Sequence, residues 1–127
     1  MECEKNQTLW IWLCYAYRTR LLVATFKTEH MEKLSEQQVS EKLKNVDSEW
    51  KKDGDFIKRS FTLKDFKQAF AFMTNVAFLA EKADHHPNWD NTYKNVNIAL
   101  STHEADGLTE KDFDLAAKID EVASHFV

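Results

Sequence analysis

Histidines gather in one short part of this 127-residue chain. His85 and His86 are adjacent and directly precede Pro87, the single proline, and His103 follows later in the same region. Imidazole is the side chain that gains and loses a proton near neutral pH. Because a proline cannot continue a helix and favours extended backbone at the residue before it, the two adjacent rings should point in different directions. The residue types and their spacing predict a site for acid–base chemistry.

Acidic side chains near these histidines could orient an imidazole and favour its charged form. They are Glu81, Asp84, Glu104 and Asp112. Simpler explanations stay open for several of these residues. A histidine just after a helix can interact with the terminal carbonyls of that helix. Asp112 could serve only as part of a helix cap, and Trp89 could serve only as packing.

A zinc hydrolase is the sharpest chemical alternative, because three histidines can hold zinc with a fourth position open for water. Two observations argue against it: adjacent histidines diverge, and the chain has neither HxH nor HExxH spacing. We therefore predict a site without a metal. The chain has two glycines and also lacks the P-loop, GxGxxG and GxSxG motifs.

The composition is that of one soluble globular domain, with 43% hydrophobic and 30% charged residues. A net charge of −4 gives no reason to expect nucleic acid or an anionic membrane surface as a partner. The two cysteines, Cys3 and Cys14, form no disulfide framework. A reducing, cytoplasmic setting is therefore expected.

The first thirty residues differ from the rest of the chain. Apolar stretches there are interrupted by Arg18 and Arg20, so no run is long enough to span a bilayer. We interpret residues 1–30 as a disordered or loosely packed extension, with a weak targeting segment as the alternative. Met31 could be the native start, and residues 31–127 form the predicted domain.

Three helix starts are marked by a hydroxyl followed three residues later by an amide or acid, with apolar residues on either side. These patterns, called capping boxes, begin at Ser35, Thr62 and Thr109. They predict helices over about 35–46, 62–83 and 109–125. Residues 50–61 are typical of a hairpin that turns at Asp53-Gly54. Residues 96–100 alternate as a half-buried strand does, with 89–93 as a shorter partner. The order α-β-β-α-β-β-α predicts an α+β domain in which three helices pack on one face of an antiparallel four-stranded sheet.

The central predicted helix has an unusually broad apolar surface. One stripe consists of Phe66, Phe70, Met73, Ala77 and Ala80, and it is widened by Phe72, Val76 and Leu79. One side of a sheet does not usually cover so much apolar area. We predict that part of it is an oligomer interface; a fully buried core helix is the alternative.

The histidines also stand in a wider pattern. Glu81-Lys82-Ala83-Asp84-His85-His86-Pro87-Asn88-Trp89 is followed by Ser101-Thr102-His103-Glu104 and then by Gly107-Leu108-Thr109. In this order and spacing, the segment resembles the pterin-4a-carbinolamine dehydratases, over roughly residues 34–122. The resemblance implies dehydration of 4a-hydroxytetrahydropterin to quinonoid dihydropterin, which recycles a tetrahydrobiopterin-type cofactor of aromatic amino acid hydroxylases. It implies that no metal or organic cofactor is needed.

Carried over by position, the resemblance makes His85, His86 and His103 the active histidines. Substrate-binding or supporting roles would fall to Glu81, Asp84, Pro87, Trp89, Ser101, Thr102, Glu104 and Asp112. Loss of hydroxide from C4a needs a proton donor at the oxygen and removal of a ring N–H proton. His85 and His103 could do these two jobs, with the order left open, while His86 binds the pterin.

The family resemblance also implies dimers or tetramers, which we expect to form through the 62–83 helix. In animals, the family also resembles a dimerisation cofactor for a homeodomain transcription factor. A non-enzymatic interaction module that uses the apolar central helix is therefore the alternative function.

Overall fold

The structure is a computed structural model that describes residues 31–126 of the chain. The predictions for residues 1–30, including a targeting segment, lie outside this part. In chain order its elements are α2 (Glu36–Lys42), β1 (Lys51–Asp53), β2 (Phe56–Thr62), α3 (Phe66–Ala83), β3 (Asn88–Thr92), β4 (Asn95–Leu100), the 3₁₀ helix η1 (His103–Ala105) and α4 (Glu110–Ala123).

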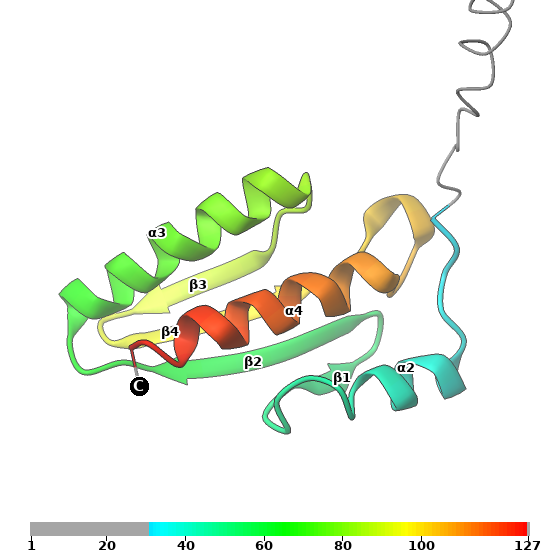
Figure 1. The fold of residues 1–127 in the computed structure, drawn as a ribbon, viewed down its shortest axis with the longest axis horizontal. Coiled ribbons are helices and arrows are strands. Elements are labelled where there is room, and N and C mark those ends of the chain that lie inside the picture. The colour runs from blue at the N-terminus through cyan, green and yellow to red at the C-terminus, as the bar shows by residue number, and fades with distance from the viewer. Residues whose placement is uncertain (1–30, 127) are drawn as a thin grey trace, which may run out of the picture. The chain divides into compact units, whose positions relative to one another are not determined.

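The four strands form one antiparallel sheet in the order β1-β2-β4-β3. The helices lie on one face of this sheet, with α3 and α4 side by side over β2, β3 and β4 (Figure 1). The predicted α+β class and the order α-β-β-α-β-β-α are confirmed. Strand alternation explains the layering, because the buried side chains Val96, Ile98 and Leu100 of β4 all point toward the helices.

Two of the three predicted helix starts are confirmed. At Ser35 the capping box is complete: its backbone N–H donates to Gln38 Oε1 at 2.8 Å and its hydroxyl accepts from the Gln38 N–H. At Thr109 the backbone N–H donates to Asp112 Oδ2 at 2.8 Å, and α4 begins at the next residue. The first helix is shorter than predicted, since α2 ends at Lys42.

The predicted helix start at Thr62 is wrong. Thr62 is the last residue of β2, and its hydroxyl donates to Asn95 Oδ1 on the neighbouring strand at 3.0 Å. Asp65 is the actual N-cap of α3, and its carboxylate accepts from the Gln68 N–H at 2.8 Å. The strand continues through Thr62 because β4 offers it pairing partners, and a carboxylate is an equally good N-cap.

Two tight turns close the hairpins of the sheet. The β1–β2 pairing brings Asp53 opposite Phe56, so the turn residues are Gly54 and Asp55, one position later than predicted. Gly54 has a φ of 59°, a left-handed conformation that glycine adopts without strain. The β3–β4 turn places Tyr93 in the same region, with a φ of 54°.

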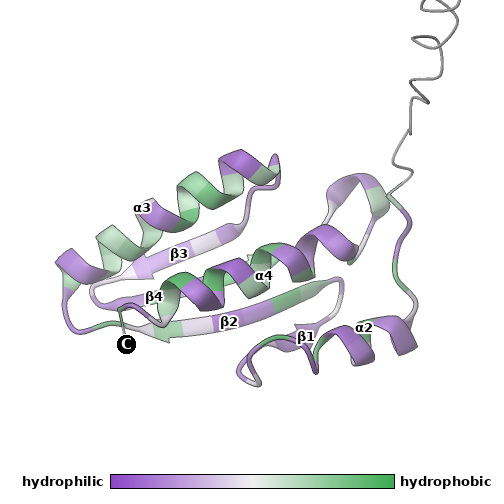
Figure 2. Cartoon of the chain, viewed as in Figure 1, coloured by the Kyte–Doolittle hydropathy of each residue, from purple (hydrophilic) through white to green (hydrophobic). Residues whose placement is uncertain are grey.

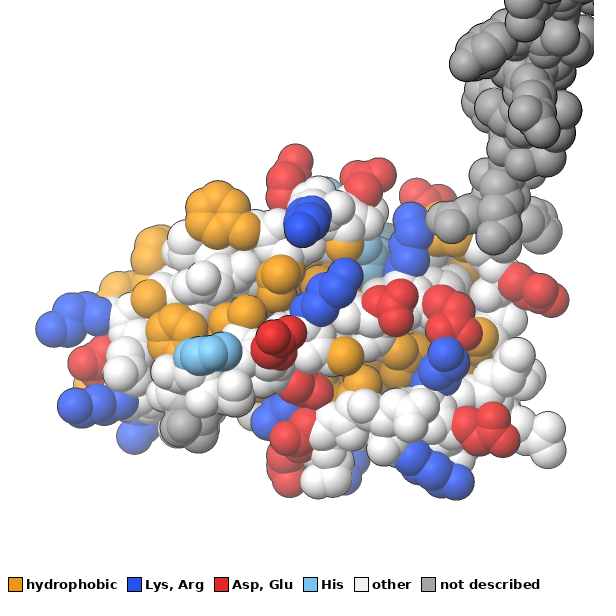
Figure 3. Space-filling model, in the orientation of Figure 1, with side chains coloured by type: hydrophobic (Ala, Val, Ile, Leu, Met, Phe, Trp, Pro, Cys, Tyr) orange, Lys and Arg blue, Asp and Glu red, His pale blue; other side chains and the backbone are white. Residues whose placement is uncertain are grey.

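The predicted apolar stripe on α3 does not coincide with its buried face. The helix buries Ala69, Phe72, Val76 and Ala80, whereas most of the predicted stripe is exposed. Phe66 and Phe70 are 49% and 59% exposed. Hydrophobic stretches alternate with hydrophilic ones along this helix (Figure 2), and hydrophobic side chains stand out on the surface in its region (Figure 3). The fully buried alternative is therefore wrong for a single chain.

None of the helices in residues 31–126 has the length and apolar character needed to cross a membrane.

Candidate active site

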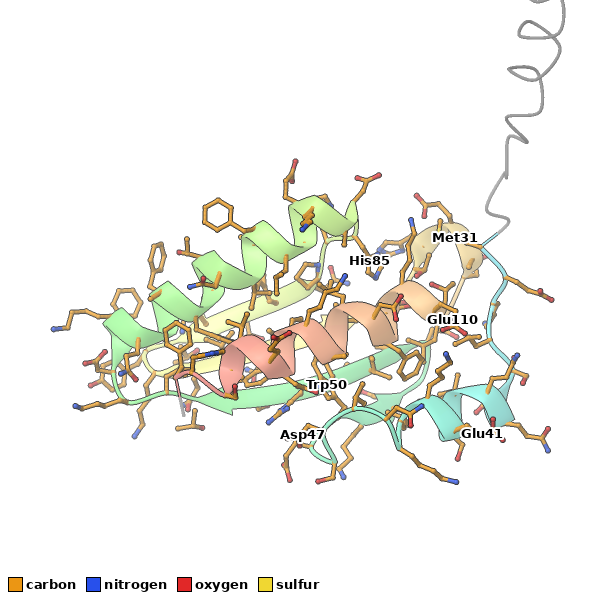
Figure 4. All side chains as sticks on the ribbon, viewed as in Figure 1. Met31, Glu41, Asp47, Trp50, His85 and Glu110 are labelled. Atoms are coloured by element: carbon orange, nitrogen blue, oxygen red, sulfur yellow. The ribbon has the colours of Figure 1, made fainter. Side chains whose placement is uncertain are left out.

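The end of α3 fixes the position of His85. Asp84 follows the last helical residue and adopts a left-handed backbone with φ 47° and ψ 46°. This turns the chain so that the His85 N–H donates to the Ala80 carbonyl at 3.0 Å. The His85 ring consequently enters the interior and is 8% exposed. Figure 4 shows His85 at this end of α3, beside the chain that leads into α4.

A buried carboxylate holds the His85 ring. Nε2 of His85 lies 2.7 Å from Oδ1 of Asp112, which has no exposed surface. The second oxygen of Asp112 accepts from the Thr102 hydroxyl at 2.9 Å and from the Thr109 N–H at 2.8 Å. The hydroxyls of Thr102 and Thr109 are themselves 2.8 Å apart. We call these four residues, His85, Thr102, Thr109 and Asp112, the dyad network.

The dyad network determines which ring nitrogen of His85 carries hydrogen. An ionised carboxylate only accepts hydrogen bonds, so Nε2 of His85 must donate to Asp112. In the neutral ring, Nδ1 then holds a lone pair. Nδ1 has no partner within residues 31–126 and is not among the fully buried polar atoms there. The free nitrogen of the pair thus keeps some exposed surface although the residue is mostly buried.

The neighbouring histidine has a different environment. Pro87 follows directly, and the side chain of His86 is 63% exposed, so the two rings diverge as the sequence predicts. Nε2 of His86 lies 3.1 Å from Oε2 of Glu81, whose side chain is 82% exposed. Because both groups are in water, this pair is weak and its geometry adjustable.

The third predicted histidine lies at the start of a short loop. His103 begins η1 and is exposed, while its neighbour Thr102 is 1% exposed and belongs to the dyad network. Thr102 binds Asp112, the carboxylate that holds His85, and His103 is the next residue along the chain. Two distant pieces of chain meet at Asp112.

The other predicted site residues have varied degrees of burial. Asp84 and Glu104 are exposed, and Pro87 and Ser101 are half-buried. Trp89 is half-buried and packs against the hydrophobic core, so packing accounts for at least part of its surface. Thr109 was expected only as a helix cap, and its hydroxyl adds a second contact to the network.

The opposite face of the sheet carries a separate hollow of about 450 Å³. Its polar side chains bond to one another: the Ser60 hydroxyl donates to Asn97, and the Asn97 amide donates to Asp90 at 2.8 Å. None of the histidines lines it. Within residues 31–126, no three histidine, cysteine, aspartate or glutamate side chains gather as a metal site would require.

Comparison with known proteins agrees with the resemblance seen in the sequence. A sequence profile of the family described as pterin 4 alpha carbinolamine dehydratase matches residues 32–122. A provisionally named pterin-4-alpha-carbinolamine dehydratase of Christiangramia forsetii is 49% identical over 92 residues, which cover 72% of this chain and 94% of that protein. A counterpart from Sinorhizobium medicae is 50% identical over 94 residues, covering 72% of this chain and 89% of the relative.

Solved structures extend the comparison to the fold. A transcriptional coactivator/pterin dehydratase from Brucella melitensis superimposes with a TM-score of 0.70 at 42% identity, covering 72% of this chain and 99% of that one. A pterin dehydratase-like protein, described as a RuBisCO assembly factor in the alpha-carboxysome, gives a TM-score of 0.51 at 27% identity, covering 58% and 88%. The histidine-bearing segment, the fold and both sets of relatives agree, and the chain belongs to the pterin 4 alpha carbinolamine dehydratase family.

Proposed function

We propose that this protein dehydrates 4a-hydroxytetrahydropterin to quinonoid dihydropterin and thereby recycles a tetrahydrobiopterin-type cofactor. Membership of the family supports a pterin carbinolamine as the substrate class. The observation that carries the proposal is the dyad of His85 and Asp112, which leaves one imidazole nitrogen free at the edge of a buried hydrogen-bond network.

The reaction needs two proton transfers and no redox step. The C4a–O bond breaks, the departing hydroxide takes a proton and leaves as water, and a ring N–H gives up its proton as the new double bond forms. Positioned acids and bases accelerate such transfers by roughly 10² to 10⁴-fold. No metal or organic cofactor is required for this balance.

We assign the base role to Nδ1 of His85. Asp112 fixes the tautomer with hydrogen on Nε2, and it stabilises the imidazolium that forms when Nδ1 takes the substrate proton. His103, on the second segment, is then the donor to the leaving oxygen. His86 is exposed and only loosely paired with Glu81, so it is free to bind the pterin. Asp84, Pro87, Trp89, Ser101 and Glu104 would shape or line the pterin pocket.

The direct test generates 4a-hydroxytetrahydropterin with a pterin-dependent hydroxylase and follows its conversion optically, with and without this protein. We expect the conversion to be faster than the spontaneous reaction. His85→Ala and His103→Ala should each lower turnover at least about tenfold. A wild-type protein that does not accelerate the reaction would refute the proposed activity, and wild-type rates in both variants would refute the assignment of roles.

A second function is favoured by the outer face of α3, where Phe66, Phe70 and Phe78 are exposed. The rings of Phe66 and Phe70 lie 6.0 Å apart, so they form a continuous apolar surface. We propose that this surface joins copies of the chain into a homodimer or homotetramer, and that it can serve a protein partner as in the alternative coactivator role. The Brucella melitensis relative is described by both functions.

Light scattering at micromolar concentration tests this surface. Phe70→Ser should reduce the average mass, whereas Tyr93→Asn, which removes an exposed aromatic from the β3–β4 turn, should not. Asparagine suits the left-handed backbone at position 93. A strictly monomeric wild-type protein would exclude self-association through α3, and histidine variants that lose activity but keep the oligomer would separate the two roles.

A further inference from the structure

The segment just before α2 crosses the loop that carries His103. The Leu34 N–H donates to the Leu108 carbonyl at 2.8 Å. One residue earlier, the Lys33 ammonium donates to the Asp106 carbonyl at 2.5 Å and lies 3.3 Å from a carboxylate oxygen of Asp55. Two consecutive residues thus hold the far end of the loop.

Gly107 makes room for this crossing. A Cβ atom at Gly107 would lie 2.4 Å from Cε and 2.8 Å from Nζ of Lys33, closer than such atoms approach. The backbone of Gly107 is not left-handed, so conformational freedom does not explain the glycine. The lack of a side chain lets the aliphatic stem of Lys33 lie directly on the loop.

The loop is closed on itself and held at both ends. Thr102 and Gly107 form an isolated bridge, with the Thr102 N–H donating to the Gly107 carbonyl at 2.9 Å. Asp106 adopts a left-handed φ of 50° to complete the turn. The Thr102 end is bound to Asp112 in the dyad network, and the Gly107 end is covered by Lys33. His103 lies between these two anchors.

We propose that Lys33 is a positioning residue, which fixes the 103–107 loop so that His103 is presented to the substrate bound beside His85. The inference rests on the proposed dehydratase function. The exposed Lys33–Asp55 ion pair contributes little by itself, because 52% and 66% of these side chains are in water. The contact with the Asp106 carbonyl, together with the stem on Gly107, is what holds the loop.

Two variants break this contact from opposite sides. Lys33→Met keeps the stem and removes the ammonium, while Gly107→Ala displaces the ammonium and leaves it intact. Each should lower kcat about three- to tenfold, the effect of losing one hydrogen bond, with KM nearly unchanged. Lys33→Arg should restore most of the rate. Lys44→Met, at an exposed lysine of the turn after α2, is the matched control and should behave as wild type.

The double variant distinguishes positioning from unrelated damage. If both changes act through one contact, the double variant that carries Lys33→Met and Gly107→Ala has a kcat no lower than that of the slower single variant. The proposal would be overturned if the fold-losses in kcat of the two single variants multiplied in the double variant. A wild-type kcat in Lys33→Met would overturn it as well. A fall in kcat that Lys33→Arg fails to restore would also overturn it.

Amide hydrogen exchange keeps the test independent of the proposed reaction. The Thr102 and Gly107 amides should exchange several-fold faster in Lys33→Met than in Lys44→Met, because the loop opens more often. If wild type proves inactive but exchange increases, the dehydratase proposal fails and the loop contact stands without a catalytic role. Unchanged exchange refutes the inference whatever the activity.

Discussion

Helix α4 carries two aspartates that are held in opposite ways. Near its beginning, Asp112 is fully buried and binds His85, Thr102 and the Thr109 N–H. Near its end, Oδ1 of Asp120 accepts from Nη1 of Arg59 at 2.5 Å and from the Trp50 indole N–H at 2.8 Å. Both carboxylates join three segments of chain. Only the first of them is bound to an imidazole, the side chain that most often serves as a general acid or base.

The difference lies in what each network leaves open. Arg59 stays charged, stacks on Phe61 with its guanidinium carbon 4.5 Å from the ring centroid, and is only 14% exposed in its side chain. Its Nη atoms are held by Asp120 and Asp47, its Nε is buried without a partner in residues 31–126, and a guanidinium has no acceptor to offer. The dyad network ends instead at Nδ1 of His85, the proposed proton acceptor. A closed network stabilises the fold, whereas an open one can do chemistry.

Asp112→Asn should have the largest effect on activity. The new amide can accept from Thr109 and Thr102 only if its oxygen faces them, and its NH₂ then faces His85. Nε2 of His85 must accept from this NH₂, so the ring hydrogen moves to Nδ1. The proposed base, Nδ1 of His85, would lose its lone pair with little change of shape. We expect turnover to fall about 10²-fold, measured in the optical assay of carbinolamine conversion.

The matched control is Asp120→Asn at the other end of the same helix. It should leave turnover unchanged, because no atom of that cluster reaches the dyad network. If Asp112→Asn kept the wild-type rate, the distinction between the open and the closed network would be wrong.

Asp120→Ala should reverse the pattern, with a large effect on stability. It leaves the Arg59 guanidinium to Asp47 alone, at 3.3 Å, and removes the acceptor of the Trp50 indole. We expect the free energy of unfolding to fall by about 2 kcal/mol, since partly buried polar groups lose their partner. Urea unfolding measures this change, and the turnover of the remaining folded protein should match wild type. A fall in turnover at equal folded fraction would show that this cluster also serves the site.

Sequence patterns predicted the order of the elements because each depends on local chemistry. The cap at Ser35, the glycine at position 54 and the alternation along 96–100 act within a few residues. The start at Thr62 failed because strand pairing with Asn95, distant in sequence, keeps Thr62 in β2, and the helix begins after Asp65 instead. The sequence predicted a broad apolar surface on α3 without saying which side meets the sheet, because periodicity does not identify that side when apolar residues lie all round the helix.

The histidines were recognisable by type and spacing, but the role proposed for His85 depends on one long-range contact. Asp112 had two readings, as a helix cap and as a support for histidine. The structure shows both contacts, with Oδ2 facing the Thr109 N–H and Oδ1 facing His85. The pairing of residues 85 and 112 follows from the packing of α3 against α4, which local patterns do not encode.

Thr102→Val measures how much the dyad depends on its supporting donors. Valine has nearly the shape of threonine, so the change removes the hydroxyl that bonds to Asp112 and Thr109. We expect a loss of about 1 to 2 kcal/mol in the free energy of unfolding. Turnover should fall less than in Asp112→Asn, because the bond from His85 to Oδ1 remains. Thr102→Ser retains the hydroxyl and should stay close to wild type in both measurements; equal losses in the two variants would exclude the hydroxyl as the cause.

Backbone conformation distinguishes the two networks as well, and gives the smallest expected effect. Asp84, next to His85, is left-handed, whereas no residue of the Arg59 cluster has a positive φ. Asp84→Gly and Asp84→Ala remove the same carboxylate, but only glycine adopts this conformation freely. We expect the glycine variant to be more stable than the alanine variant by about 1 kcal/mol in urea unfolding, after its larger entropy loss on folding is included. Because the carboxylate is absent from both, the difference isolates the backbone that turns His85 toward Asp112. Equal stability would mean that residue 84 bears no strain and that the turn follows from the His85 contacts alone.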